Sequence, residues 1–368
     1  MRFSCERDDL VKALGGVSGV VAAKGIHPVY ESVEIVATAD GLEILGTDLE
    51  IGMRVRVPAG DACTVEQAGT AVVPAQRLNA IVRELPKGRV VIAWNADQRE
   101  CTITAGRGRF RLQGQSPEDF PEIPSVDEAH SVTLDPVALR NLIHLTAFAA
   151  ARERMRYALN GVLVKVEGGT IEFVATDGRR LARATSPVVN GAEGGFQAII
   201  PTKGLQQLDK SLTDGDGEVR IAVANNHMCA RTSRVSVVSR LVEGSFPNYR
   251  DVIPASCKQK AIIPRESFAA ALKRATLVTS RDAQSVRLAF GPEGLGVSAQ
   301  SADGAADEQI ECDFQGPAET VGFNPEFLLE AMNVLTGETI QFEWNDRKSP
   351  GKVTEGGYVY VVMPVSLE

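Results

Sequence analysis

The chain has 368 residues, with 39 Lys or Arg against 47 Asp or Glu and a net charge of −8. Its composition is 44% apolar and 23% charged, which excludes a disordered or fibrous chain. No apolar run approaches the roughly 18 residues of a membrane span. Because charged residues occur near the start, we expect no signal peptide, and six scattered cysteines are typical of reduced thiols. We expect a cytoplasmic protein of two or three domains.

The predicted elements begin with a unit that occurs three times. Residues 3–14, 132–143 and 261–272 each contain a short apolar strand, a polar turn and a helical pattern. A second helical pattern recurs at residues 74–85, 201–212 and 324–335, with a proline at or near its start. Each repeat therefore predicts two helices of about 10–12 residues.

Strand patterns occupy the rest of each repeat. Alternating or β-branched runs lie between Gly- and Pro-rich turns, at residues 33–36, 55–57, 162–166, 235–238 and 358–363. Thr47-Asp48 in the first repeat matches Thr176-Asp177 in the second, and the third repeat lacks this pair. We predict an α+β fold of three repeated domains, 1–126, 127–255 and 256–368, dominated by antiparallel sheet.

Enzyme and metal-binding signatures are missing from the sequence. It contains no phosphate-binding loop, no G-x-G-x-x-G, no nucleophile elbow and no C-x-x-C pair. An acidic stretch at 214–218 faintly resembles a calcium loop, but its twelfth position is Asn225 rather than the required Glu. We expect no catalytic residue, no metal site and no cofactor.

The basic residues are unevenly distributed. Residues 1–126 carry 14 basic and 17 acidic side chains, residues 127–255 carry 15 and 14, and residues 256–368 carry 10 and 16. A chain of net negative charge can bind nucleic acid only if its basic residues gather on one surface. The helices carry basic residues off their apolar faces. These side chains form either a solvated surface or a surface that faces phosphates.

Several motifs resemble one family, the β subunit of bacterial DNA polymerase III, or sliding clamp. They follow the family's order along essentially the whole chain: Gly46-Thr47-Asp48-Leu49-Glu50, Arg156-Tyr157-Ala158-Leu159-Asn160-Gly161, Ala175-Thr176-Asp177-Gly178-Arg179-Arg180-Leu181-Ala182, Phe246-Pro247-Asn248-Tyr249 and Tyr360-Val361-Val362-Met363-Pro364. The resemblance implies clamp domains with helices inside and sheets outside. Two chains would form a head-to-tail ring around duplex DNA, without catalysis.

The resemblance also implies partners. A clamp loader would open the ring with ATP, and the closed ring would tether the replicative polymerase and other proteins that carry short clamp-binding peptides. Because the ring holds DNA by enclosure, weak contacts to phosphates suffice and permit sliding. Such a protein would be cytoplasmic and associated with the nucleoid.

Three sets of site residues follow from the resemblance. The DNA-facing set is Lys24, Arg77, Arg83, Arg152, Arg156, Tyr157 and Lys203. The partner-peptide pocket is Leu159, Thr176, Gly178, Arg180, Leu181, Pro247, Val252, Val361, Met363, Pro364 and Val365. The ring interface is Phe110 and Leu112 on one side with Leu277 and Val278 on the other. An apolar pocket with few polar groups suits a short peptide with Leu and Phe anchors.

Two departures from the family pattern concern the pocket, and one alternative function stays open. Asp251 and Ser366 stand where the family commonly has basic residues near the pocket, which affects the peptide preferred. A diverged clamp-like adaptor would bind partner peptides without encircling DNA. Loss of DNA retention after substitution of Lys24 and Arg156 would distinguish a clamp from such an adaptor.

Overall fold

The computed structural model describes residues 1–22, 27–127, 131–152, 157–191, 195–213, 215–279, 285–302 and 304–367. By contacts it divides into two compact units. Unit 1 comprises residues 1–139, 188–195 and 203–241, and unit 2 comprises residues 140–187, 196–202 and 242–368. The division passes through the second repeat because strands of neighbouring repeats pair with one another.

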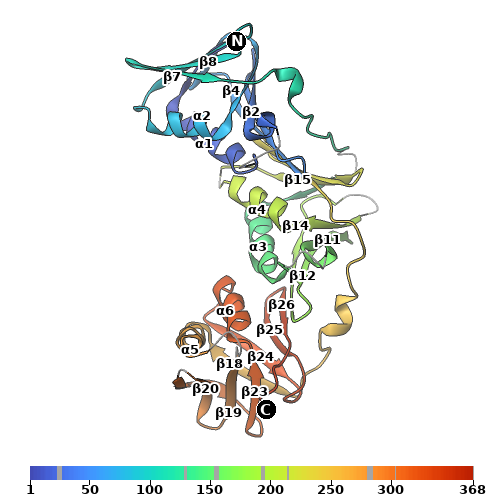
Figure 1. Cartoon of the computed structure of the whole chain (residues 1–368). Helices are drawn as coiled ribbons and strands as arrows, with labels where there is room; N and C mark the ends of the chain where they lie inside the picture. Colours follow the sequence, from blue (N-terminus) through green and yellow to red (C-terminus); the bar gives the residue numbers. More distant parts are fainter. Residues whose placement is uncertain are drawn as a thin grey trace. The chain divides into compact units, whose positions relative to one another are not determined.

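The three repeats share one order of elements, strand then helix, a run of strands, a second helix and further strands (Figure 1). The first repeat contains β1 (Arg2–Glu6), α1 (Arg7–Ser18), η1 (Pro28–Glu31), β2 (Ser32–Thr38), β3 (Gly41–Thr47), β4 (Ile51–Pro58), β5 (Cys63–Gln67), β6 (Gly69–Pro74), α2 (Ala75–Glu84), β7 (Arg89–Asn95), β8 (Glu100–Ala105), β9 (Gly108–Gln113) and η2 (Pro117–Asp119).

The second and third repeats follow the same plan. The second contains β10 (Val132–Leu134), α3 (Pro136–Thr146), η3 (Ala147–Ala149), η4 (Tyr157–Leu159), β11 (Gly161–Glu167), β12 (Thr170–Thr176), β13 (Arg180–Pro187), β14 (Phe196–Pro201), α4 (Thr202–Ser211), β15 (Val219–Ala224), β16 (His227–Arg231), β17 (Val235–Arg240) and η5 (Tyr249–Val252). The third contains β18 (Gln259–Pro264), α5 (Arg265–Thr276), β19 (Val286–Gly291), β20 (Gly294–Ser301), β21 (Gly304–Ile310), β22 (Asp313–Phe314), β23 (Glu319–Phe323), α6 (Pro325–Val334), β24 (Thr339–Trp344), β25 (Gly351–Glu355) and β26 (Tyr358–Val362).

The predicted helices are present, and their starts differ in detail. A polar turn was predicted before the first helix of each repeat, but α1 follows β1 directly and α5 follows β18 directly. Only α3 has a separate polar residue, Asp135, whose carboxylate accepts the amides of Val137 and Ala138 at 2.8 and 3.0 Å. A side-chain cap of this kind satisfies amides that the first helical turn leaves without partners.

Sheets continue from one repeat into the next. In unit 1 an eight-stranded sheet has the order β10-β15-β16-β17-β4-β3-β2-β6, so β17 of the second repeat pairs with β4 of the first. In unit 2 a nine-stranded sheet has the order β14-β11-β12-β13-β26-β25-β24-β18-β22, and β13 pairs with β26 of the third repeat. A five-stranded sheet (β5-β1-β7-β8-β9) and a four-stranded sheet (β21-β20-β19-β23) complete the units.

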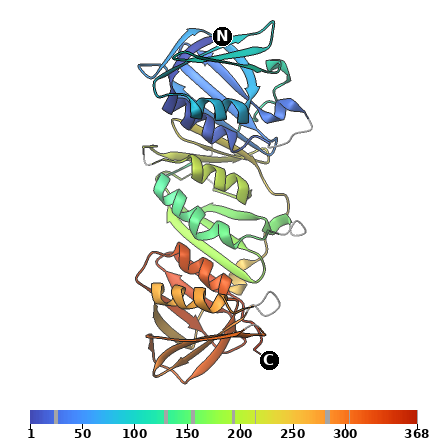
Figure 2. The same ribbon diagram turned by 60° about the vertical axis from the view of Figure 1, so that its left-hand side comes forward.

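In the first and third repeats the core lies between a helix pair and its sheets. Helix α1 buries Leu10, Ala13, Leu14 and Val17, the i, i+3, i+4, i+7 positions of one face, and packs on α2, β3 and β4. Helices α5 and α6 lie side by side in the third repeat (Figure 2). The core beside them is rich in aromatic rings, with Phe290 and Trp344 centroids 4.2 Å apart.

Gly46 of β3 provides a test of helix packing in the first repeat. A Cβ atom there would lie 2.5 Å from Val17 Cγ1 and 2.8 Å from Val21 Cγ2, whereas a Cβ at Gly60 meets nothing within 4 Å. We predict that Gly46→Ala destabilises the protein by about 1–3 kcal/mol, because two stiff valines must move. Gly60→Ala is the control. Urea unfolding measures both, and equal effects would contradict this account.

Candidate functional site

The segment Thr176–Arg180 forms a tight turn between β12 and β13. The Thr176 hydroxyl donates to the Arg180 carbonyl at 2.5 Å and accepts the Gly178 amide at 3.0 Å. Asp177 Oδ1 accepts the amides of Arg179 and Arg180 at 2.9 and 3.0 Å. Gly178 has φ +88°, a left-handed conformation that glycine adopts without steric cost. The Thr-Asp-Gly sequence thus fixes the backbone of this turn.

The same turn occurs in the first repeat. The Thr47 hydroxyl donates to the Ile51 carbonyl at 2.9 Å and accepts the Leu49 amide at 2.9 Å, and Asp48 accepts the Ile51 amide at 2.8 Å. Leu49 occupies the place of Gly178, with φ +76° and 56% of its surface exposed. The match between the two Thr-Asp pairs in the sequence therefore reflects an equivalent structure.

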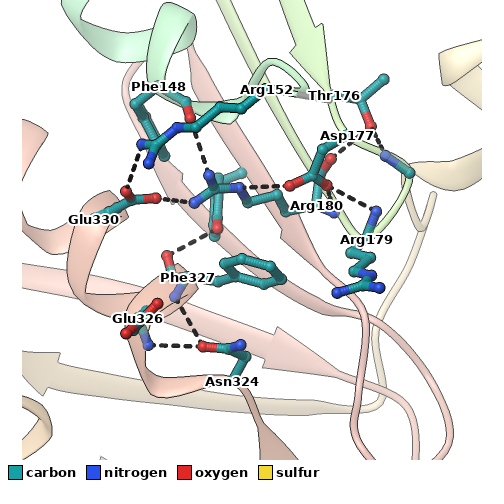
Figure 3. Close-up of polar contacts among 12 residues, drawn as sticks. Phe148, Arg152, Thr176, Asp177, Arg179, Arg180, Asn324, Glu326, Phe327 and Glu330 are labelled. Carbon is teal, nitrogen blue, oxygen red and sulfur yellow. Dashed lines mark hydrogen bonds and ion pairs between the residues drawn. The ribbon is translucent and has the colours of Figure 1, made fainter. Parts of the chain in front are cut away.

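Arg180 is a buried cation, only 6% exposed, at the centre of a polar cluster (Figure 3). Its guanidinium donates to Asp177 Oδ2 at 3.1 Å, to the Phe148 carbonyl at 3.0 Å and to Glu330. The guanidinium carbon lies 5.4 Å from the ring centroid of Phe148 and 4.4 Å from that of Phe327. Burial opposes ionisation, but Glu330 and the neighbouring groups outweigh it and raise the Arg180 pKa.

Glu330 connects this cluster to a surface cation. Its Oε1 accepts Arg152 Nη2 at 3.1 Å, while its Oε2 binds Arg180 (Figure 3). Glu330 belongs to α6 of the third repeat, and Arg180 begins β13 of the second. The pair therefore joins neighbouring repeats within unit 2.

A cavity of about 160 Å³ opens beside the Thr176–Arg180 turn. It is lined by Leu159, Thr176, Gly178, Arg179, Arg180, Leu181, Pro247, Asn248, Tyr249, Val252, Val361 and Met363. Leu181 and Val361 form its buried floor, while Val252 and Met363 are 43% and 40% exposed. An apolar floor with exposed apolar side chains is suited to the anchor residues of a ligand.

Tyr249 holds one wall of the cavity in place. Its hydroxyl donates to Glu172, which also binds Arg183. Burial, reinforced by Glu172, raises the Tyr249 pKa, so the hydroxyl stays protonated at neutral pH. The ring packs in a buried cluster with Leu181 and Val361. The wall and the floor are therefore parts of one core.

The structure brings together nine of the eleven residues predicted for the pocket. Pro364 and Val365 do not line the cavity, because the tail turns toward β23, where the Val365 amide donates to the Gly322 carbonyl at 2.8 Å. Three lining residues were missed: Arg179, Asn248 and Tyr249. All three lie inside quoted motifs, so motif membership could have identified them.

The predicted DNA-facing residues have diverse surroundings. Lys24 and Arg156 lie outside the described residues, as does the side chain of Tyr157. Arg77 and Arg83 are exposed on α2. The other two contact carboxylates: Lys203 of α4 contacts Asp48, and Arg152 contacts Glu330.

The predicted interface residues lie at the ends of two sheets. Phe110, 41% exposed, is on β9, an edge strand. Leu277, 81% exposed, follows α5, which packs on the edge strand β21. Val278 is half-buried. Leu112, predicted for the same side of the interface as Phe110, is 8% exposed and belongs to the core of this chain.

Within the described ranges, no group of three or more His, Cys, Asp or Glu side chains is placed to hold a metal ion. Across the same residues, no helix combines the length and apolar character needed to cross a membrane.

Comparison with known proteins identifies the family. Models of the N-terminal, central and C-terminal domains of the DNA polymerase III beta subunit match residues 1–124, 133–248 and 250–366. The chain belongs to this family. It is 33% identical to the beta sliding clamp of Pseudomonas aeruginosa and 30% identical to that of Escherichia coli K12, over all of each chain.

Solved clamps share the fold. The Bacillus subtilis DNA polymerase sliding clamp superposes with a TM-score of 0.94 at 28% identity, covering both chains completely. A Pseudomonas aeruginosa clamp bound to griselimycin gives 0.94 at 32% identity, also with complete coverage. This chain is therefore a DNA sliding clamp, a processivity factor for the polymerase and not an enzyme. The expected three-domain clamp fold is confirmed, and the exact domain boundaries stay a prediction.

Glu330 provides a test of the cluster around Arg180. We predict that Glu330→Ala destabilises the clamp by about 1–3 kcal/mol, less than the loss of a fully buried partner, because Asp177 still neutralises Arg180 and Glu330 is partly exposed. Glu326→Ala, an exposed change on the same helix, is the control. Urea unfolding measures both variants. A Glu330→Ala effect no larger than that of the control would refute the assignment.

Proposed function

We propose that this clamp closes as a head-to-tail homodimer around duplex DNA and binds partner proteins through the cavity beside Thr176–Arg180. The binding of partner proteins is inferred from the cavity itself. Leu181 and Val361 form its apolar floor, and Val252 and Met363 are exposed at its sides. Short linear peptides with Leu and Phe anchors suit such a site. The ligands are the replicative polymerase, the clamp loader and other proteins that carry such segments.

The ring interface is assigned to the two edge strands β9 and β21. Several other edges already receive a backbone hydrogen bond, as β6 does from Gln115 and β23 from Val365. Strand β9 carries Arg109 and Arg111, whereas β21 carries Asp307 and Glu308. Opposite charges and exposed apolar side chains favour pairing of β9 in one chain with β21 in the other.

The DNA-facing surface is assigned to the basic residues of the sequence prediction. Exposed Arg77, Arg83 and Lys203 lie on helices, the elements that would line the ring. Asp48 and Glu330 partly neutralise Lys203 and Arg152, so their contacts to phosphates would be weak. Weak contacts suit a protein that slides. Such a clamp would be associated with the nucleoid.

A peptide-binding adaptor that does not encircle DNA is not favoured. The chain matches clamps over their entire length, in all three domains. An adaptor that forms no ring would not need the opposite charges and exposed apolar side chains found at β9 and β21.

Met363 tests the pocket. We predict that Met363→Asp weakens binding of a fluorescent peptide with Leu and Phe anchors at least tenfold, because a carboxylate would be desolvated against an apolar ligand. Val189→Asp is the control, since Val189 is exposed and lies away from the cavity lining. Fluorescence anisotropy measures both affinities. Equal affinities for wild type and Met363→Asp would place peptide binding elsewhere.

A charge reversal tests the ring. We predict that Arg109→Asp shifts the dimer toward monomer in sedimentation and abolishes retention on nicked circular DNA after loading with a clamp loader and ATP. Adding Asp307→Arg to the same chain restores both, because each interface then regains opposite charges. Retention on circles must resist salt and end on linearisation. Salt-sensitive retention equal on circular and linear DNA would contradict enclosure.

A further inference from the structure

Two of the six cysteines face each other across neighbouring strands of the first repeat. Cys5 lies on β1 and Cys63 on β5, and the antiparallel register of these strands sets the two residues, the cysteine pair, directly opposite each other. Side chains at paired positions lie on the same face of a sheet. Both side chains are completely buried, and both residues are free thiols in this structure. The sheet therefore holds two thiols together inside the first repeat.

The backbone hydrogen bonds place the cysteine pair at the closer of the two antiparallel spacings. The Glu6 amide donates to the Ala62 carbonyl at 2.7 Å, and this bond flanks the pair instead of joining it. The Cys63 amide donates to the Gly60 carbonyl at 3.2 Å, and the Cys63 carbonyl accepts the Gly60 amide at 2.9 Å. Opposed residues that do not bond to each other have Cα atoms about 4.5 Å apart, within the range of roughly 4.4–6.8 Å found in disulfides. The strands thus have the spacing that a disulfide requires.

The two thiols of the cysteine pair differ in acidity. The Cys5 thiol donates a hydrogen bond to the Cys63 sulfur, and this bond lowers the pKa of Cys63. Burial and Asp9 oppose the effect, whereas the positive charge of Arg89 reinforces it. The same hydrogen bond, together with burial, raises the pKa of Cys5. Cys63 is therefore the nucleophile of the pair, and Cys5 is the thiol that stays protonated beside it.

Three other cysteines are less reactive. Burial raises the pKa of Cys101 to about 12, and it also raises the pKa of Cys257 and of Cys312. A thiol with a raised pKa holds little thiolate, which is the form that oxidants attack. On its own strand, Cys101 stands opposite Trp94 and Leu112, which offer no second sulfur. Cys101 therefore serves as an internal comparison for the cysteine pair in the same sheet.

The cysteine pair lies close to solvent although its side chains are buried. Strand β5 is an edge of the sheet β5-β1-β7-β8-β9. Asp61 and Thr64, on either side of Cys63 in the chain, are exposed. An edge strand with exposed neighbours belongs to the parts of a protein that open locally at low cost. Hydrogen peroxide is little larger than water, so a local opening of β5 admits it to Cys63 while the core stays folded.

We propose that Cys5 and Cys63 form a reversible disulfide when hydrogen peroxide oxidises the clamp, which locks β5 onto β1. The Cys63 thiolate attacks one peroxide oxygen, the O–O bond breaks, and a sulfenic acid forms while the released hydroxide takes up a proton. The Cys5 sulfur then attacks the Cys63 sulfur, so that the S–S bond forms, the S–O bond breaks, and the hydroxyl leaves with the Cys5 proton as water. The two thiols lose two electrons, and the peroxide gains them as it becomes two waters. A dithiol reductant reverses the reaction by exchange.

The disulfide constrains the first repeat. It closes a loop that contains α1, β2, β3 and β4. A cross-link over a long loop stabilises a protein mainly by restricting the unfolded chain. Strands β5 and β9 are opposite edges of one sheet, so the lock leaves the edge assigned to the ring interface free. Oxidation therefore stabilises the clamp without occupying that edge.

Mild oxidation of the folded clamp with a small molar excess of hydrogen peroxide tests the proposal. We expect a linked peptide containing Cys5 and Cys63 in a non-reducing digest analysed by mass spectrometry, and a melting temperature raised by about 5 °C or more. Dithiothreitol is expected to reverse both changes. Cys63→Ala is expected to abolish both, whereas Cys5→Ala leaves Cys63 as a sulfenic acid that dimedone labels. Cys101→Ala, which changes a buried cysteine of the same sheet, is the matched control and keeps both changes.

Thermal unfolding of the reduced variants shows whether each is folded, and the peptide map of the wild type does not depend on any variant. The proposal is overturned if the folded wild type gives no linked peptide, or gives it only after denaturation in urea. It is also overturned if oxidation raises the melting temperature of Cys63→Ala as much as that of the wild type, because the stabilisation then has another source.

Discussion

The unpaired edge of a β-sheet is the constraint on which this architecture depends. An exposed edge presents backbone donors and acceptors that pair with any available strand. Here the edges of neighbouring repeats pair with each other, β17 with β4 and β13 with β26, so each of two sheets joins strands from two repeats. The proposed pairing of β9 in one chain with β21 in another would join subunits in the same way and close a ring.

The peptide cavity depends on a second constraint, the burial of charge. The buried charge of Arg180 is tolerated because Asp177, Glu330 and a backbone carbonyl surround it. Those partners come from two repeats, and the turn that carries Arg180 also carries the cavity lining. Cavity shape and inter-repeat geometry are therefore set by the same contacts, since displacement of α6 would remove Glu330 and leave Asp177 as the carboxylate that neutralises Arg180.

Local periodicity was enough to predict the six helices and the threefold repeat, because each amphipathic face recurs at a fixed spacing. The resemblance identified nine of the cavity residues, eight of them within the quoted motifs. The sequence could not show that Pro364 and Val365 leave the cavity, since the hydrogen bond from the Val365 amide to the Gly322 carbonyl directs the tail. Alternation placed Phe110 and Leu112 on one face of β9, but it could not show that Leu112 is buried and Phe110 exposed, since a pattern does not reveal what covers each side chain. The Glu330 and Arg180 contact spans 150 positions, and no local pattern reveals it.

The paired turns of the first two repeats have a consequence for stoichiometry. At the position where the second repeat has Gly178, which lines the cavity, the first has Leu49, an exposed side chain. The third repeat lacks the Thr-Asp pair altogether. Under the proposed function each chain therefore contributes one cavity of the Thr176–Arg180 kind, and a ring of two chains has a valency of two. Two partner proteins would then occupy one ring together, and a third would wait for an exchange.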